Sequence, residues 1–113
     1  MALLIVDRNN TLSNKSRELL ERRLSFALSR FDSRIMRVSA IIEDLNGPRG
    51  GIDKRCRITV KMSGAKDVII SDQDSDIIQC IANAADRAGR SVARAIDRSQ
   101  RSYRTRPLNV DSP

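Results

Sequence analysis

The sequence predicts an α+β fold in which four strands and two helices follow one another in the order β-α-β-β-β-α. Two segments repeat apolar residues at helical spacing, one at residues 14–31 and a longer one that begins after residue 76. Four short segments rich in Val, Ile and Leu lie before and between them. Each helix has one apolar stripe, so we expect a four-stranded sheet with two helices packed on one face.

The first strand is expected at residues 2–7 and the first helix at 14–31, with Ser13 as its N-cap. The side chains of one apolar stripe should pack on the sheet; they are Leu20, Leu24, Ala27, Leu28 and Phe31. Leu19 and Phe26 lie off this stripe. They are either ordinary exposed side chains or part of a contact surface, and the sequence leaves both readings open.

The second strand is expected at residues 35–43, a turn-rich loop at 44–54, the third strand at 55–62 and the fourth at 67–71. In the second strand one side should carry Met36, Val38, Ala40 and Ile42. The third strand has the clearest alternation, in which Cys56, Ile58, Val60 and Met62 alternate with Arg55, Arg57, Thr59 and Lys61. This pattern indicates a sheet with one covered face and one wet, basic face.

Acidic residues at 72–76 precede the second helix, where carboxylates suit the positive end of the helix dipole. They lack the spacing of a calcium loop, so we interpret them as a helix start and not as a metal site. The inward side of this helix is expected to hold Ile78, Ile81, Ala85, Ala88, Gly89, Val92 and Ile96.

Residues 86–106 hold seven arginines and two aspartates, a net charge of +5 in a chain whose total is +7. At about 100° per residue, five of them project within roughly 40° of one direction: Arg87, Arg90, Arg94, Arg98 and Arg101. Guanidinium groups match the geometry of phosphate oxygens, which favours contact with nucleic acid. The alternative is a solvated charged face, but like charges four residues apart oppose a helix.

Composition narrows the function further. We expect one domain at residues 1–101 and a basic, flexible tail at 102–113. Aromatic residues make up 3% of the chain, which argues against reading single strands by stacking. The absence of His removes the commonest general base and metal ligand, so we expect no enzyme, cofactor or metal. Cys56 and Cys80 have no metal-type spacing and are expected to be buried.

Three stretches carry a resemblance to a known family: LLIVDRNNTLS, RFDSRIMRVSAIIEDLNGPRGGIDKRCRITVKM and DIIQCIANAADRAGRSVARAI. The chain resembles the ribosome hibernation-promoting factors, also called ribosome-associated inhibitors or sigma-54 modulation proteins. The resemblance implies the same fold, in a short form without the dimerising domain. It also implies binding to the small ribosomal subunit in the channel of mRNA and tRNA. Ile78 and the loop at 46–51 depart from the family pattern, which puts ribosome dimerisation in doubt.

In the family the contacts to ribosomal RNA come mostly from basic residues of the two helices. The resemblance carries this role to Arg87, Arg90 and Arg94, and to Arg22, Arg23 and Arg30 of the first helix. From charge and position we add Arg98, Arg101, Lys54, Arg55, Arg57 and the loop residue Arg49. The expected partner is ribosomal RNA in the cytoplasm. No membrane or small-molecule substrate is expected, and the free protein should be a monomer.

Two other functions stay open from the sequence. A helix, three strands and a helix are also the layout of double-stranded-RNA-binding domains, so a general structured-RNA-binding module is one alternative. The other is a protein-interaction module regulating a sigma factor, which would bind an acidic partner. Such an interface needs apolar anchors; the arginine face has none, whereas Leu19 and Phe26 on the first helix could supply a small one.

Overall fold

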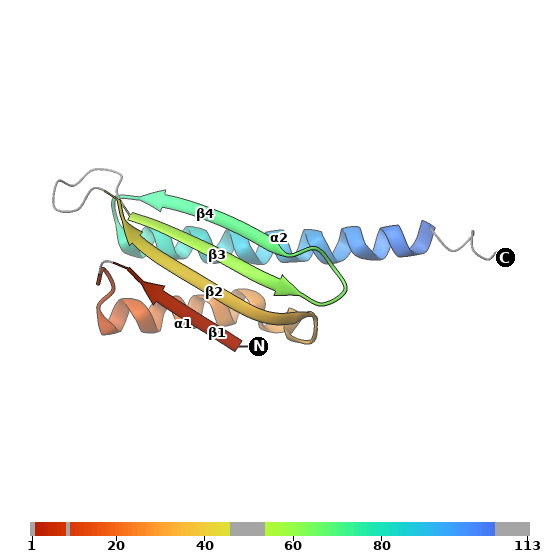
Figure 1. Ribbon diagram of the computed structural model, residues 1–113, viewed down its shortest axis with the longest axis horizontal. Helices are drawn as coiled ribbons and strands as arrows, with labels where there is room; N and C mark the ends of the chain where they lie inside the picture. The colour runs from red at the N-terminus through yellow and green to blue at the C-terminus, as the bar shows by residue number, and fades with distance from the viewer. Residues whose placement is uncertain (1, 9, 46–53, 106–113) are drawn as a thin grey trace.

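The computed structural model describes residues 2–8, 10–45 and 54–105, with side chains as far as Arg101. Its elements follow the expected order (Figure 1). They are β1 (Ala2–Asp7), α1 (Asn14–Leu28), the 3₁₀ helix η1 (Ser29–Arg34), β2 (Ile35–Asp44), β3 (Lys54–Met62), β4 (Val68–Asp74) and α2 (Ile77–Thr105). The predicted α+β fold is confirmed.

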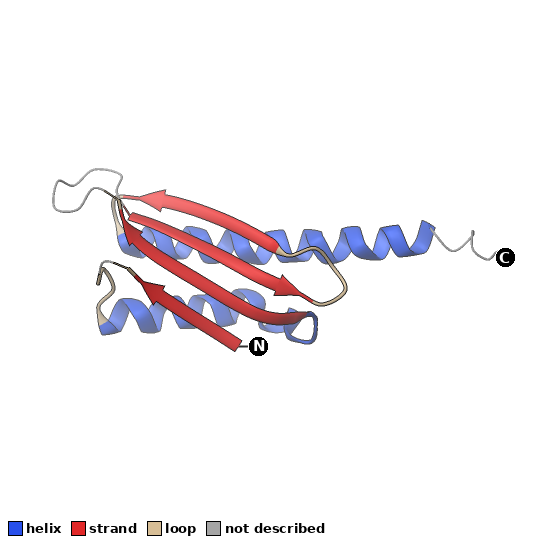
Figure 2. Cartoon of the chain, viewed as in Figure 1, coloured by secondary structure: helices blue, strands red, loops and turns tan. Residues whose placement is uncertain are grey.

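The four strands form one mixed sheet in the order β1-β2-β3-β4. β1 runs parallel to β2, whereas β2, β3 and β4 are antiparallel neighbours. A parallel pair needs a crossover connection, and α1 supplies it. Figure 2 shows both helices on the same side of the sheet, as the apolar stripes predicted.

Side-chain hydrogen bonds organise the connection between β1 and α1. The Asp7 carboxylate accepts from the backbone N–H groups of Thr11 and Leu12, each at 2.8 Å. The Ser13 hydroxyl accepts from the N–H of Ser16 at 3.1 Å, so the predicted N-cap is confirmed.

The first helix ends earlier than predicted. Its α-helical turns stop at Leu28, and the chain continues as the 3₁₀ helix η1 up to Arg34. Arg34 donates to the carbonyl oxygens of Ser63 and Gly64, both at 3.2 Å, and so ties η1 to the β3–β4 turn. The stripe residues Leu20, Leu24 and Leu28 are fully buried, whereas Ala27 and Phe31 are only partly buried.

The prediction that Met36 faces the core was wrong. Its side chain is 57% exposed, and Ile35 is buried in its place. The cause is a β-bulge, because the pairing with β3 shifts between Ile35 and Arg37 and interrupts the alternation of β2. Beyond the bulge the expected inward residues are fully buried, namely Val38, Ala40 and Ile42.

The fourth strand extends through part of the acidic segment. Asp72 and Asp74 belong to β4 and not to the start of the helix, because their backbones pair with Cys56 and Lys54 of β3. Asp76 fulfils the expected role, since its carboxylate accepts from the N–H of Ile78 at 3.0 Å in the first helical turn.

The long helix α2 packs along β3, β4 and α1. Ile78 was expected to face inward but is 44% exposed. It is rotated by about 60° around the helix from Ile81, which takes the buried position together with Cys80. α2 continues to Thr105, past residue 102, where the tail was expected to begin.

Both cysteines are fully buried, as predicted, and neither forms a disulfide. Burial is the main cause that raises the pKa of the Cys56 thiol to about 12 and that of Cys80 to about 11. The Cys80 thiol also lies 3.3 Å from the carbonyl oxygen of Asp72. These groups are therefore small apolar parts of the core and not reactive thiols.

Candidate nucleic-acid interface

The predicted arginine row lies on the surface of α2. The apolar side of α2, which includes Ala88 and Val92, is buried against the sheet. From the first arginine to the last, the row extends along about 21 Å of the helix axis. Five exposed side chains form it, which we call the α2 arginine row: Arg87, Arg90, Arg94, Arg98 and Arg101.

Three members of the row have partners within the protein. Arg87 donates to the carbonyl oxygen of Ser71 at 2.8 Å and lies 3.3 Å from the carboxylate of Asp72, both in β4. Arg90 pairs with Asp86 at 3.8 Å, and Arg101 pairs with Asp97 at 3.1 Å. The last two are i,i+4 pairs, the arrangement typical of a solvated helix face. Nearby carboxylates therefore neutralise part of the positive charge of the row, which the spacing of its arginines alone does not show.

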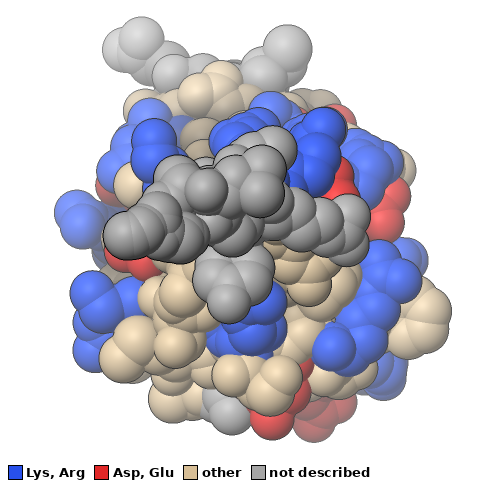
Figure 3. Space-filling model, turned by 90° about the vertical axis from the view of Figure 1, so that its right-hand side faces the viewer, with Lys and Arg blue, Asp and Glu red and all other residues tan. Residues whose placement is uncertain are grey.

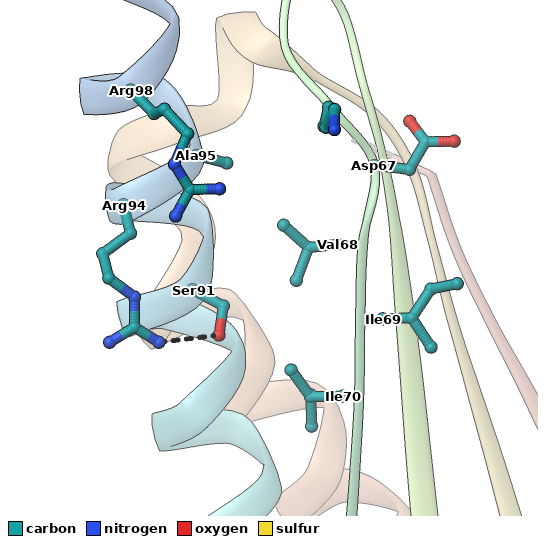
Figure 4. A pocket seen from close by; sticks show the side chains of 9 residues that line it. Asp67, Val68, Ile69, Ile70, Ser91, Arg94, Ala95 and Arg98 are labelled. Carbon is teal, nitrogen blue, oxygen red and sulfur yellow. Dashed lines mark hydrogen bonds between the residues drawn. The ribbon is translucent and has the colours of Figure 1, made fainter.

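Arg94 and Arg98 differ from these three, because no carboxylate of the described residues pairs with either. Both line a groove of about 240 Å³ between α2 and β4, where Lys66 adds a third cation. In Figure 4 their side chains lie on α2 opposite Val68 and Ile70 of β4. Arg94 makes one long side-chain contact, to the Ser91 hydroxyl at 3.5 Å. This part of the row has guanidinium donors available for an external anion.

The cations at the beginning of β3 are used inside the protein. Arg55 donates to the Glu43 carboxylate, and its Nε lies 3.0 Å from the acceptor oxygen. This hydrogen bond is the main cause that holds the pKa of Glu43 below its ordinary value of 4.5. Lys54 lies 3.5 Å from Asp44, its directly opposite neighbour in β2. We therefore interpret the main role of Lys54 and Arg55 as ion pairing across the strands β2 and β3.

Arg57 and the row on α2 face different sides of the molecule. Its neighbours Cys56 and Ile58 are buried under the helices, so Arg57 projects from the opposite, open face of the sheet together with Lys61. Figure 3, which looks along the long axis, shows Lys and Arg on several sides instead of in one cluster. One flat RNA surface cannot contact both faces, whereas a partner that surrounds the protein can.

On α1, the predicted residues Arg22 and Arg23 are exposed and have no ion pair within the described residues. Arg30 lies in η1, where its guanidinium stands over the ring of Phe31 at 4.6 Å from the centroid. The structure also separates the two apolar residues that the sequence left undecided. Leu19 is partly buried against the core, whereas Phe26 is 86% exposed. Arg49 lies outside the described residues.

Sequence reasoning missed two cations that the structure places near the candidate surfaces. Lys66 lies in the turn before β4 and becomes part of the α2–β4 groove. Arg37 is exposed on β2, directly opposite Lys61 in β3. The first depends on where α2 crosses the sheet, which the spacing of residues does not give. The second alternates with the buried Val38, so the expected pattern of β2 already placed it on the open face of the sheet.

The described residues contain no cluster of three or more His, Cys, Asp and Glu side chains able to hold a metal ion. Over the same residues, no helix combines the length and apolar composition needed to cross a membrane.

Comparison with known proteins gives a family match over most of the chain. Residues 3–100 match the family described as sigma 54 modulation protein / S30EA ribosomal protein. None of the curated proteins matches the sequence. The fold is similar to that of the Thermus thermophilus Protein Y N-terminal domain, with a TM-score of 0.67 and 23% identity over 83% of this chain and 98% of that one.

A ribosomal subunit interface protein from Coxiella burnetii is also similar, with a TM-score of 0.65 and 16% identity over 83% of this chain and 96% of that one. At these identities the two likenesses show a shared fold. The family match covers most of β1 and α2 and all of the elements between them, including the α2 arginine row as far as Arg98. The chain therefore belongs to the sigma 54 modulation protein / S30EA ribosomal protein family.

Proposed function

We propose that this protein binds the ribosome in the cytoplasm and blocks translation as a hibernation factor. In this proposal the α2 arginine row contacts ribosomal RNA of the small subunit in the channel that mRNA and tRNA otherwise use. The observation that carries the proposal is the pair Arg94 and Arg98, two exposed guanidinium groups without a carboxylate partner among the described residues, on the helix of a member of this family.

The mechanism is steric and needs no chemical step. Folded RNA presents a dense phosphate surface that proteins recognise largely by shape and backbone charge. A helix holds the Cα atoms of its arginines at fixed spacing, and the planar guanidinium group loses less freedom for each hydrogen bond to phosphate than a flexible ammonium group does. The bound domain then occupies the volume that the substrates of translation need. Arg22 and Arg23 on α1, and Arg57 on the open face of the sheet, would meet further RNA where a channel surrounds the protein.

One of the two anchors of the protein-interaction alternative is weakened. Leu19 is partly buried against the core, so it offers a docking partner less apolar surface than Phe26 does. The general RNA-binding alternative rests on a layout of a helix, three strands and a helix. This protein departs from that layout, because β1 adds a fourth strand parallel to β2. Equal affinity for an arbitrary RNA duplex and for ribosomes at one salt concentration would favour that alternative.

A pair of charge-reversal variants tests which face binds. Arg94→Glu/Arg98→Glu alters the α2 row, and Arg37→Glu/Lys61→Glu makes the same charge change on the open face of the sheet. All four side chains are exposed, so both variants should keep the circular dichroism spectrum of the parent. In sedimentation with small ribosomal subunits at low salt, we expect the α2 variant to bind roughly tenfold or more weakly than the sheet variant.

Equal losses in the two variants would mean that the α2 face contributes no more to binding than the open face of the sheet does, and would contradict the leading role that we assign to the α2 arginine row. Unchanged sedimentation of the folded α2 variant would remove the RNA contact that we assign to Arg94 and Arg98.

A further inference from the structure

Phe26 is the most exposed large apolar side chain of the described residues, with 86% of its surface in solvent. It lies on the outer side of α1, because Leu24 and Leu28 turn the opposite side of the helix into the core. No described residue covers the ring. The residues around the ring therefore indicate which kind of group could cover it.

The ring borders a groove of about 360 Å³ between α1 and α2, a volume within the range of small-ligand sites. The floor of the groove is Gly89, which packs on Ala27. A Cβ atom at Gly89 would lie only 3.2 Å from the Ala27 carbonyl oxygen. Because glycine has no side chain, it lets the helices approach and leaves the space above them open.

Two arginines line the same groove. Arg90 belongs to the α2 arginine row, and its internal partner Asp86 is 3.8 Å away. Arg30 is held over the ring of Phe31 at 4.6 Å from the centroid. The groove is therefore lined by an exposed aromatic ring, two guanidinium groups and one carboxylate.

This chemistry fits a nucleotide better than an apolar protein surface. A nucleobase stacks on an aromatic ring whatever its sequence, and its phosphate binds guanidinium. A protein anchor is instead usually surrounded by further apolar residues that exclude water. Here only Ala27 accompanies the ring, and both flanks of the groove are charged.

We propose that the groove between α1 and α2 binds one unpaired nucleotide of RNA, whose base stacks on Phe26 while Arg30 and Arg90 hold its phosphate. This inference rests on the proposed RNA-binding function and adds to it a single-nucleotide subsite. The low aromatic content argued against stacking, but one exposed ring in a basic groove is enough for one base.

The sequence contains no Trp, so Phe26→Trp places a single indole at the proposed site. A stacked base quenches indole fluorescence, whereas phosphate charge alone does not. The probes are a single-stranded oligoribonucleotide, a fully paired RNA duplex with the same number of phosphates, and inorganic polyphosphate. Met36→Trp, at a position that is 57% exposed on β2, is the matched control.

We expect the single strand to quench the indole of the Phe26→Trp variant several-fold more than polyphosphate or the duplex does, and to leave the control indole unchanged. Similar quenching by polyphosphate, or none by any probe, would overturn the proposal. So would equal quenching in the two indole-bearing variants.

Binding of the single strand by Phe26→Leu and Phe26→Ala separates stacking from simple apolar contact. Both variants should bind roughly tenfold more weakly than the parent, whereas Phe26→Trp should bind as tightly. Parent-like binding by Phe26→Leu would contradict a stacked base.

The indole readout uses no ribosomes, so the two proposals can fail separately. An unquenched indole in a protein that still sediments with ribosomes removes only the stacking site. A quenched indole in a protein that does not sediment with ribosomes removes only the ribosome function.

Discussion

Arg55 and Arg57 lie two residues apart on β3, but only Arg57 is available for contact with a partner. Arg55 is bonded to Glu43, whereas Arg57 is exposed on the open face of the sheet. Their shared charge and spacing made both candidates for RNA contact. What separates them is the register that places Glu43 directly opposite Arg55. The sequence of the loop between β2 and β3 does not determine this register. The pairing of Arg55 with Glu43 could therefore not be predicted from the sequence.

The ion pair of Glu43 predicts a pH dependence of stability. Arg55 and Arg8 favour the ionised carboxylate, so its pKa lies below 4.5 in the folded protein. A depressed folded-state pKa stabilises the protein above the unfolded value, and that contribution is lost as the pH falls through the folded value. Glu43→Gln should therefore be less stable than the parent at neutral pH, and the difference should shrink below pH 4.5.

Urea unfolding of the two proteins at neutral pH and at about pH 3.5 measures this difference. Glu18→Gln removes an exposed carboxylate of α1 that has no ion pair in the described residues, so it controls for the change in net charge. A gap between Glu43→Gln and the parent that is the same at both pH values would show that the carboxylate contributes no ionic stabilisation.

At the scale of elements, periodicity predicted the type and order of the two α-helices and the four strands, because alternation and helical stripes reflect burial directly. It failed where the backbone departs from a regular repeat. The bulge between Ile35 and Arg37 exposed Met36, and the change to a 3₁₀ helix after Leu28 shortened α1. Neither event has a distinctive residue pattern, since each depends on how the strand or helix meets its neighbours.

The approach of the two helices predicts the effect of a single substitution. In Gly89→Leu the new side chain must enter the space where a Cβ would already lie 3.3 Å from the Cβ of Ala27. Leucine favours a helix over glycine by roughly 0.8 kcal/mol, but overpacking costs about 1–3 kcal/mol. We therefore expect a net loss in the free energy of unfolding, measured by urea denaturation. A variant more stable than the parent would mean that α1 can move away without cost.

At the scale of the whole molecule, the sheet separates two basic surfaces. The α2 arginine row covers the helix side, whereas Arg57, Lys61 and Arg37 lie on the open side. Sequence analysis predicted both surfaces, the open face from the alternation of β3 and the arginine row from helical spacing. It could not predict which of the cations pair within the protein, because that depends on strand register and on how α2 crosses the sheet. Two opposed basic faces suit a partner that surrounds the protein, as the walls of an RNA channel would.

The most direct test of this account is sedimentation of the parent protein with separated small subunits, large subunits and intact ribosomes at two salt concentrations. We predict co-migration with small subunits and intact ribosomes at low salt. If three to five arginines each neutralise one phosphate, affinity should fall roughly sixfold to twentyfold for each doubling of salt. Protein that stays at the top of the gradient at both salts, or that follows the large subunit alone, would contradict the account.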